Sequence, residues 1–264
     1  MGLPNRVGLR GELSPRSLLI TGASSGIGEA LALLYAAPGV TLRLIGRDAA
    51  RLETVAQQAQ ALGARIDSQT VDVTDAPALN ACLLAWDAVI PFDLIIANAG
   101  ISAGSGDGLE SEADLRRITD VNVLGVINTI APLLPRLQQR RRGQIALMAS
   151  LAGYRGLGGA AAYCASKAWV KVYGEALRLT LAPQGIRVSV ICPGFVESRI
   201  TARNRFPMPF LMSAARAAAI IQRDLTRNRA RITFPWPMAA MVSVLAALPV
   251  ALTDRLLSRL PKKT

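Results

Sequence analysis

Histidine is absent from this sequence of 264 residues. Its absence excludes histidine-based catalytic triads and histidine metal sites, so proton transfer must fall to tyrosine, lysine, aspartate, glutamate or cysteine. Cysteine is scarce: Cys82, Cys164 and Cys192 are far apart, form no CxxC pair and lie among apolar neighbours. We expect them to be reduced thiols of the core rather than disulfide partners or metal ligands, and we expect no metal site.

The chain is also poor in aromatic and acidic residues. Aromatic side chains make up 5% of the residues, and 30 basic residues outnumber 18 acidic ones, which gives a formal net charge of +12. So few aromatic rings, together with the lack of a nucleic-acid-binding motif, indicate that nucleic acid is not a partner. The positive charge suits cofactor phosphates or acidic lipid head groups, although an ordinary solvated surface accounts for it equally well.

Short apolar runs alternate with longer helical patterns along most of the chain. We predict strands at 17–21, 41–45, 66–71, 93–97, 144–148 and 187–191, and helices at 26–36, 49–62, 76–89, 110–137 and 160–181. Strict alternation with continuously apolar strands is typical of a parallel sheet covered by helices on both faces. The expected fold is therefore α/β: one doubly wound, Rossmann-like domain spanning 1–264, with ligands at the carboxyl ends of its strands.

A glycine-rich turn, TGASSGIG, separates the first predicted strand from its helix. Its glycines, Gly22, Gly26 and Gly28, follow the pattern GxxxGxG. Glycines allow close approach of a pyrophosphate, and the N-terminus of the following helix offers free N–H groups and the positive end of its dipole. A purely structural turn is the alternative, but the position directly after the first strand favours a phosphate-binding role.

Six motifs in a fixed order carry a resemblance to a known family. They are TGASSGIG, the triplet Asn98-Ala99-Gly100, Asn122, Ser150, the pair Tyr163-x-x-x-Lys167, and Pro193-Gly194. Over residues 17–200 the chain resembles the compact branch of the short-chain dehydrogenase/reductase family. The resemblance implies an NAD(P)-dependent oxidoreductase that acts on a small carbonyl or alcohol substrate and assembles as a homodimer or homotetramer.

The resemblance also implies which residues bind the cofactor. They are Gly22, Ser24, Ser25, Gly26, Ile27, Gly28, Arg47, Asp72, Val73, Asn98, Ala99, Gly100, Tyr163, Lys167, Pro193, Gly194, Val196 and Ser198. Asp72 and Val73 are expected beside the adenine and Val196 beside the nicotinamide carboxamide. Ser198 stands where a threonine is usual, and its hydroxyl offers the same contact.

Tyr163 and Lys167 are four residues apart on a predicted helix, so both side chains project from one face. Hydride delivery to a carbonyl leaves an alkoxide that needs a proton, and a phenol can donate it. The pKa of a free tyrosine is about 10, and a nearby ammonium would lower it. Ser150, at a strand end, could polarise the carbonyl, and by resemblance Asn122 holds a water that connects Lys167 to solvent. Chance spacing, a strand-end cap and an ordinary buried amide are the alternatives for these residues.

The second predicted strand ends at Gly46 and Arg47, where a carboxylate would select NADH. A guanidinium without that carboxylate predicts a preference for NADP(H), with NAD(H) as a second cofactor. Ser25 argues for a partial preference, because many NADP-using relatives carry a basic residue there. Alternatively, Arg47 pairs with Asp48 or with solvent.

Two segments are expected to select the substrate, 151–158 and the apolar lid 199–212, and the lid favours a lipophilic compound. Their arginines, Arg155, Arg199, Arg203 and Arg205, could attract an anionic substrate group, but solvated or cofactor-bound arginines are more common. A protein that binds the cofactor without catalysis, as a sensor or scaffold, is the alternative function.

The segment 236–252 is almost uncharged and a basic tail follows it. Within the extension 233–264 it could pack on the domain or on a partner subunit, lie in a membrane interface, or span the membrane. Residues 1–16 lack the apolar core of a secretory signal, so we expect a cytoplasmic protein, with peripheral attachment to the inner face of the membrane as the alternative.

Overall fold

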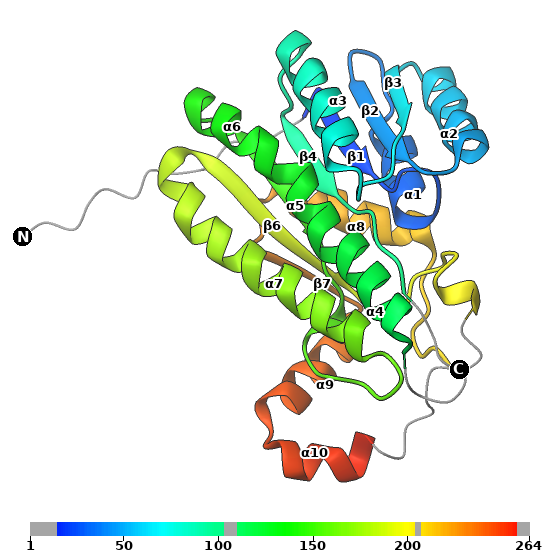
Figure 1. Ribbon diagram of the computed structural model, residues 1–264, viewed down its shortest axis with the longest axis vertical. Helices are drawn as coiled ribbons and strands as arrows, with labels where there is room; N and C mark the ends of the chain where they lie inside the picture. Colours follow the sequence, from blue (N-terminus) through cyan, green and yellow to red (C-terminus); the bar gives the residue numbers. More distant parts are fainter. Residues whose placement is uncertain (1–14, 103–109, 204–206, 258–264) are drawn as a thin grey trace, which may run out of the picture.

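The structure is a computed structural model that describes residues 15–102, 110–203 and 207–257. Residues 1–14 lie outside these ranges, so most of the segment 1–16, which was predicted not to be a secretory signal, is not described. Arg205 of the lid and the side chain of Arg203 also lie outside them. Within the described ranges the strands form one parallel sheet in the order β3-β2-β1-β4-β5-β6-β7 (Figure 1). The strands are β1 (Ser17–Thr21), β2 (Thr41–Gly46), β3 (Arg65–Thr70), β4 (Leu94–Ala97), β5 (Gly143–Met148), β6 (Ile186–Pro193) and β7 (Arg231–Phe234).

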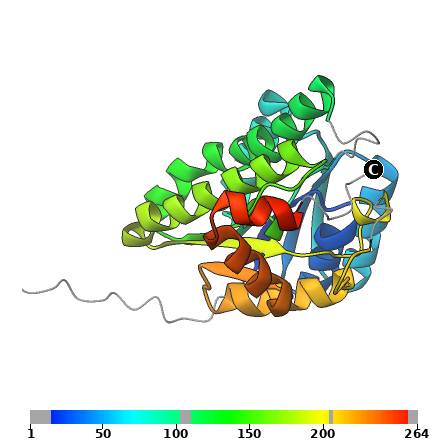
Figure 2. The same ribbon diagram turned by 90° about the horizontal axis from the view of Figure 1, so that it is seen from below.

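Helices cover both faces of this sheet (Figure 2). Apolar residues of α1 (Gly26–Tyr35), α2 (Ala49–Ala61) and α8 (Ala214–Thr226) form one buried cluster with one face of the strands. Residues of α3 (Ala76–Val89), α5 (Gly125–Ile130), α6 (Leu134–Arg140) and α7 (Ala161–Leu181) form a second cluster with the other face. Alternate residues of β1 show the division, because Leu18 and Ile20 belong to the first cluster and Leu19 to the second. The predicted doubly wound α/β fold is confirmed.

The predicted long helix at 110–137 is a single helical path with two irregular segments. It consists of α4 (Glu112–Thr119), a π-helical segment at Asp120–Leu124, α5, a 3₁₀ turn at Ala131–Leu133, and α6. Proline explains the second irregularity, since Pro132 has no N–H to donate to the preceding turn. The π segment carries Asn122, and such segments are frequent at functional sites.

Sequence reasoning missed β7 and α8. The strand β7 has only four residues, begins with an exposed arginine and pairs with β6 alone among the described strands. Two further helices follow it, α9 (Trp236–Ala247) and α10 (Val250–Leu257), and both project beyond the sheet in Figure 1.

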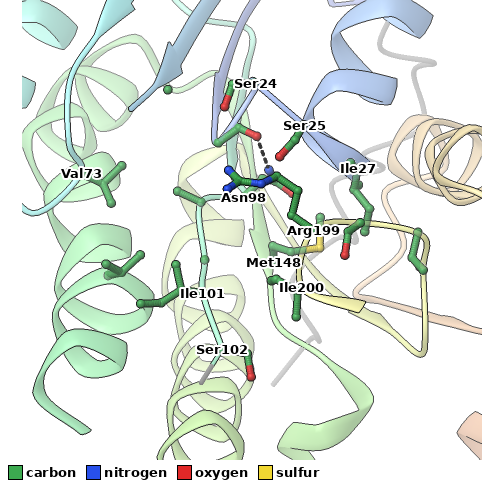
Figure 3. Close-up of a pocket in the computed structure, with 18 of the residues that line it drawn as sticks. Ser24, Ser25, Ile27, Val73, Asn98, Ile101, Ser102, Met148, Arg199 and Ile200 are labelled. Carbon is green, nitrogen blue, oxygen red and sulfur yellow. Dashed lines mark hydrogen bonds between the residues drawn. The ribbon is translucent and has the colours of Figure 1, made fainter. Parts of the chain in front are cut away.

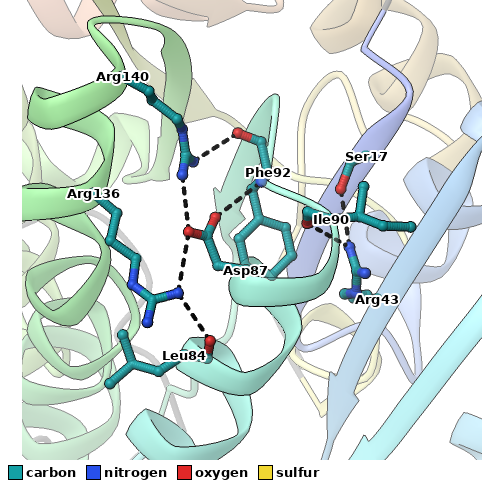
Figure 4. A network of polar contacts seen from close by, with 8 residues as sticks. All are labelled: Ser17, Arg43, Leu84, Asp87, Ile90, Phe92, Arg136 and Arg140. Atoms are coloured by element: carbon teal, nitrogen blue, oxygen red, sulfur yellow. Dashed lines mark hydrogen bonds and ion pairs between the residues drawn. The ribbon is translucent and has the colours of Figure 1, made fainter.

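A buried polar network secures the amino ends of the central strands (Figure 4). The carboxylate of Asp87 is almost fully buried; its Oδ2 lies 2.8 Å from Arg140 and 3.5 Å from Arg136. Its other oxygen accepts a hydrogen bond from the backbone N–H of Phe92, 3.0 Å away. This network lies at the opposite ends of the strands from the glycine turn, Asn98 and Ser150, so the carboxyl ends are left for ligand binding.

Candidate functional site

The glycine turn joins the end of β1 to the start of α1 in a conformation that needs glycine. Gly22 has φ +67° and Gly26 has φ +59°, which side-chain-bearing residues rarely adopt. At Gly28 the constraint is space, because an added Cβ would lie 2.2 Å from the carbonyl oxygen of Gly22. The turn is therefore tightly wound on itself, with the N-terminus of α1 directed to the carboxyl edge of the sheet.

Asn98, directly after β4, holds this turn in place. Its side-chain amide donates to the carbonyl oxygens of Thr21, at 3.0 Å, and Gly22, at 3.2 Å. In return, the Thr21 hydroxyl accepts from the backbone N–H groups of Asn98 and Ala99 at 3.1 and 3.2 Å. Figure 3 shows Asn98 close to Ser24 and Ser25 of the turn, with Ile101 and Ser102 further along the loop. The ends of β1 and β4 are thus fastened together beneath the turn.

A cavity of ≈ 590 Å³ lies over these strand ends. Most of the residues expected to bind the cofactor or to take part in catalysis line it: Gly22, Ser24, Ser25, Gly26, Ile27, Arg47, Val73, Asn98, Ala99, Gly100, Ser150, Tyr163, Lys167, Pro193, Gly194, Val196 and Ser198. Gly28, Asp72 and Asn122 are not among its lining residues. Gly28 lies behind the turn, Asp72 contacts Arg47, and Asn122 supports the loop after β4.

Ser150, Tyr163 and Lys167 meet at one part of the cavity. The Lys167 ammonium donates to the carbonyl oxygen of Met148 at 2.9 Å and lies 5.8 Å from the centre of the Tyr163 ring. The Ser150 hydroxyl hydrogen-bonds with Tyr163 and accepts from the backbone N–H of Ala152 at 3.1 Å. Ser150 therefore caps the short turn after β5, as one alternative supposed, and also contacts the phenol.

Burial dominates the protonation of this group. Removal of water raises the pKa of Tyr163, and the hydrogen bond from Ser150 opposes that rise. Burial also lowers the pKa of Lys167, from 10.5 to about 8. The lysine is therefore a cation at neutral pH that readily gives up its proton as the pH rises.

Asn122 occupies the π segment and is fully buried. Its carbonyl oxygen accepts from the backbone N–H of Ile101 at 2.8 Å, and its amide donates to the Ile101 carbonyl and the Ser166 hydroxyl, both at 3.0 Å. Sequence reasoning missed Ser166, although it directly precedes Lys167. The Ser166 hydroxyl donates to the carbonyl of Tyr163 at 2.8 Å, so Asn122 connects the loop after β4 to the helix that carries the tyrosine and lysine.

Two arginines lie at the end of the cavity formed by β2. Arg47 is about half exposed and pairs with Asp72 at 3.3 Å, not with Asp48 as the alternative proposed. Asp48 instead pairs with Arg51, at 2.6 Å, a cavity residue that sequence reasoning missed. Burial raises the pKa of Asp72, but hydrogen bonds from Thr74 and the charge of Arg47 outweigh that effect and leave it below its usual value.

The two segments expected to select the substrate direct their arginines to different places. Arg155 donates to the hydroxyl of Thr253 and lies 3.7 Å from the carboxylate of Asp254, so it contacts α10. Arg199 lines the cavity and is exposed. Thr201, which was not singled out from the sequence, holds the start of the lid because its hydroxyl donates to the carbonyl of Val196 at 2.8 Å.

The residues present suit a dinucleotide cofactor that carries nicotinamide. The glycines allow close approach of a pyrophosphate, the start of α1 offers N–H groups, and the arginines lie beyond them. Tyr163 and Lys167 lie at a different part of the same cavity. A cleft with this glycine turn, these arginines and a tyrosine–lysine pair, at the carboxyl edge of a doubly wound sheet, is the arrangement expected of a nicotinamide-dependent oxidoreductase.

Comparison with known proteins agrees with this class. Residues 16–207 match the family model described as short chain dehydrogenase. An uncharacterized oxidoreductase of Myxococcus xanthus is 40% identical over 250 residues, which are 94% of this chain and 99% of the relative.

Two solved structures share the fold. A short-chain dehydrogenase from Sphingobium yanoikuyae in complex with NADPH aligns with a TM-score of 0.79 and 26% identity, over 93% of this chain and 96% of that one. A 3-oxoacyl-(acyl-carrier protein) reductase from Brucella melitensis with bound NAD aligns with a TM-score of 0.71 and 27% identity, over 89% and 96% of the two chains. The chain belongs to the short-chain dehydrogenase/reductase family and is an NAD(P)-dependent oxidoreductase.

Proposed function

We propose that this protein is an NADPH-dependent reductase of a lipophilic ketone or aldehyde. The observation that carries the proposal is the meeting of Ser150, Tyr163 and Lys167 in the cavity that the glycine turn also lines. A reduced nicotinamide bound there supplies the hydride. What this chain must supply is a proton, a means to polarise the carbonyl, and a fixed geometry.

Tyr163 is the proton donor in this proposal. Its phenol hydrogen-bonds with Ser150, whose hydroxyl also makes a long contact of 3.4 Å to the carbonyl oxygen of Pro193 and can turn from it toward a substrate oxygen. The Lys167 ammonium, 5.8 Å from the ring centre, stabilises the phenolate left after proton donation. Asn122 and Ser166 act by position, since they hold the loop after β4 against the helix of Tyr163.

Arg47 and Arg51 support the choice of NADPH. Both line the cavity beside the end of β2. The strand ends in Gly46, at the position where an acidic side chain would select NADH. The two solved relatives differ in their cofactors, NADPH in one and NAD in the other, so the choice depends on this chain's own residues. Ser25 gives the glycine turn no basic side chain for a 2′-phosphate. Arg47 and Arg51 offer two guanidinium groups instead.

Exposed apolar residues in the two segments expected to select the substrate support a lipophilic one. In the lid, Phe210 and Leu211 are 56% and 45% exposed, and Leu157 in the segment after Ser150 is 38% exposed. Ile200 and Ile101 line the cavity itself. The arginine of the first segment does not favour an anionic substrate, because Arg155 already contacts α10.

The substitution Tyr163→Phe tests the proposed chemistry. It removes only the hydroxyl, so we expect kcat/KM with a ketone panel to fall by about 10³-fold, as for loss of a general acid. NADPH binding, measured by fluorescence titration, should stay within about twofold, because the ring remains. Full turnover in this variant would remove Tyr163 from its role. Tight NADPH binding by the wild type without turnover of any carbonyl would instead favour a cofactor sensor.

The substitution Arg51→Ala tests the cofactor preference. Loss of one charged hydrogen bond to a 2′-phosphate should raise the KM for NADPH about tenfold and leave the KM for NADH unchanged. Arg116→Ala is the matched control, because that arginine is exposed on α4 and, among the residues that the structure describes, pairs with Glu112 of its own helix at 2.7 Å. Equal effects on the two cofactors would contradict the role of Arg51.

The remaining expectations on assembly and location stay predictions. A homodimer or homotetramer agrees with the apolar residues exposed along α7, where Val172 is 58% and Leu179 is 79% exposed. The cytoplasmic location stays an expectation from the sequence. Sedimentation of the purified protein at several concentrations tests the assembly state. The single-domain prediction for 1–264 is tested by one cooperative unfolding transition.

A further inference from the structure

The helices α9 and α10 expose an unusual amount of apolar surface. Trp236 is 79% exposed, Val244 61% and Met241 52% on α9, and Leu252 is 60% and Val250 58% exposed on α10. Single exposed apolar residues are ordinary, but several on two consecutive helices mark a surface that meets something other than water. We call the exposed residues of these two helices the α9–α10 surface.

The surface carries little polarity within its helices. α9 has no charged residue, and its serine, Ser243, directs its hydroxyl to the carbonyl of Ala239 at 2.7 Å. The sequence 232–264 contains one acidic residue, Asp254, which lies 3.7 Å from Arg155. An apolar environment would therefore leave few polar groups of the described part of this surface without a partner.

The sequence that follows Asp254 carries charge of one sign. The sequence 255–264 contains four basic residues and no acidic one, and the whole chain carries a net charge of +12. Each basic residue near an anionic bilayer contributes about 1 kcal/mol of attraction. Exposed tryptophan and aliphatic residues next to basic ones are typical of segments that lie in the plane of a membrane interface.

The lengths of the helices exclude a crossing of the membrane by this segment. A 12-residue helix such as α9 is about 18 Å long, whereas the hydrocarbon core is about 30 Å thick. Pro249 separates it from α10. Among the described residues, one helical stretch is long and apolar enough to cross a membrane, Glu112–Arg140. That stretch contributes Val126, Ile130 and Leu137 to the buried cluster on the sheet, so it is a core helix.

We propose that the α9–α10 surface docks this protein on the interface of an anionic lipid bilayer. A second copy of the chain is the less favourable occupant, because a two-fold contact would bring two copies of the same basic sequence together. A bilayer of acidic lipids would bury the apolar residues of the surface, and its anionic head groups would attract the basic residues.

The surface lies one layer of side chains from the candidate active site. On its inner side, Met238 of α9 is buried, and its sulfur would lie 2.8 Å from a Cβ added to Gly194, a cavity residue. Arg155 connects α10 to the segment that follows Ser150. A lipophilic substrate would then reach the cavity from the bilayer rather than from water. This consequence rests on the proposed function, whereas lipid binding itself does not.

Vesicle co-sedimentation of the full chain tests the proposal. Wild-type protein should bind vesicles of phosphatidylcholine with phosphatidylglycerol much more tightly than vesicles of phosphatidylcholine alone, and added salt should weaken the binding. Val244→Glu places a charge on the exposed surface and should lower the partition coefficient about tenfold or more. Val89→Glu is the matched control, because Val89 is 73% exposed at the end of α3, and it should bind as the wild type does.

The controls separate docking from the other occupants and from misfolding. NADPH binding and the unfolding midpoint of Val244→Glu should equal those of the wild type, which shows that the protein is folded. Tryptophan fluorescence should be quenched by brominated lipids in the wild type and much less in Trp236→Phe.

No binding to anionic vesicles, or equal loss in both glutamate variants, overturns the proposal. A wild-type dimer that Val244→Glu converts to a monomer, without vesicle binding, assigns the surface to a second copy. Because no step measures turnover, failure here leaves the proposed reaction untouched.

Discussion

Replacement of the buried lysine should make the protein more stable at neutral pH while it abolishes catalysis. Lys167 is 4% exposed, and burial lowers its pKa from 10.5 to about 8. That lowering corresponds to about 3 kcal/mol by which the folded state disfavours the ammonium. Lys167→Met removes the charge and keeps an unbranched side chain of similar length, which adapts well to an existing space.

The expected gain is smaller than the full penalty, because a hydrogen bond is lost as well. Lys167 donates to the carbonyl oxygen of Met148 at 2.9 Å, and loss of such a donor costs about 1 kcal/mol. The free energy of unfolding of Lys167→Met at pH 7 should therefore exceed that of the wild type by about 2 kcal/mol. For a protein of this size that is a rise in Tm of about 5 °C.

The difference should depend on pH in a known direction. Well below pH 8 the wild-type lysine is charged in both states and the penalty is complete. Between pH 8 and 10.5 the folded lysine is neutral while the unfolded one still binds a proton, so wild-type stability rises with pH. By pH 10.5 the penalty is gone, and the variant should be about 1 kcal/mol less stable than the wild type because of the lost hydrogen bond.

The assay is urea unfolding of both cofactor-free proteins at pH 7 and pH 10. Other groups that titrate in this range are common to both proteins and cancel in the difference. Lys171→Met, one turn further along α7, is the control, and it should gain no stability because its ammonium already lies 3.9 Å from Glu175. An advantage of Lys167→Met that is absent at pH 7, or equal at both pH values, would refute the reasoning.

Two further substitutions test the buried network around Asp87 and the glycine turn. Asp87→Ala should lower the free energy of unfolding by about 3 kcal/mol in urea titration, because it removes the buried carboxylate that pairs with two arginines and accepts from a backbone N–H (Figure 4). A loss below about 1 kcal/mol would show that water replaces the carboxylate. Gly28→Ala should abolish NADPH binding in fluorescence titration, because its Cβ would lie 2.2 Å from the carbonyl oxygen of Gly22, whereas Gly156→Ala, with nothing within 4 Å, should bind normally. Equal binding by both alanine variants would show that the turn adapts.

Much of the fold could be predicted because its signals are local. The apolar run of β1 and the glycines after it lie within twelve residues, and their strand and helix were placed at Ser17 and Gly26, as observed. The same holds for α3, which begins after Asp75, a side chain that accepts from the N–H of Ala78. By contrast, β7 has four residues and its pairing with β6 joins positions about forty residues apart, so no local pattern identifies it.

The contacts within the site were less predictable for the same reason. Arg47 pairs with Asp72, 25 residues away, where the local alternative was the adjacent Asp48. Arg155 contacts Thr253, 98 residues away, where the sequence indicated an anion site or solvent. Arginine reaches many partners with similar energy, so its choice is set by the packing of the elements. Residue type predicted which residues line one cavity better than it predicted individual contacts.

The order of the sheet has a consequence for synthesis on the ribosome. Each strand after β1 pairs with at least one strand that precedes it in the chain, since β2 and β4 join β1, β3 joins β2, and β5, β6 and β7 add in turn to the growing edge. No strand has to wait for a later one, so the sheet can grow outward as the chain emerges. The glycine turn and Asn98 are therefore made before Tyr163, and α9 and α10 follow the last strand of the sheet.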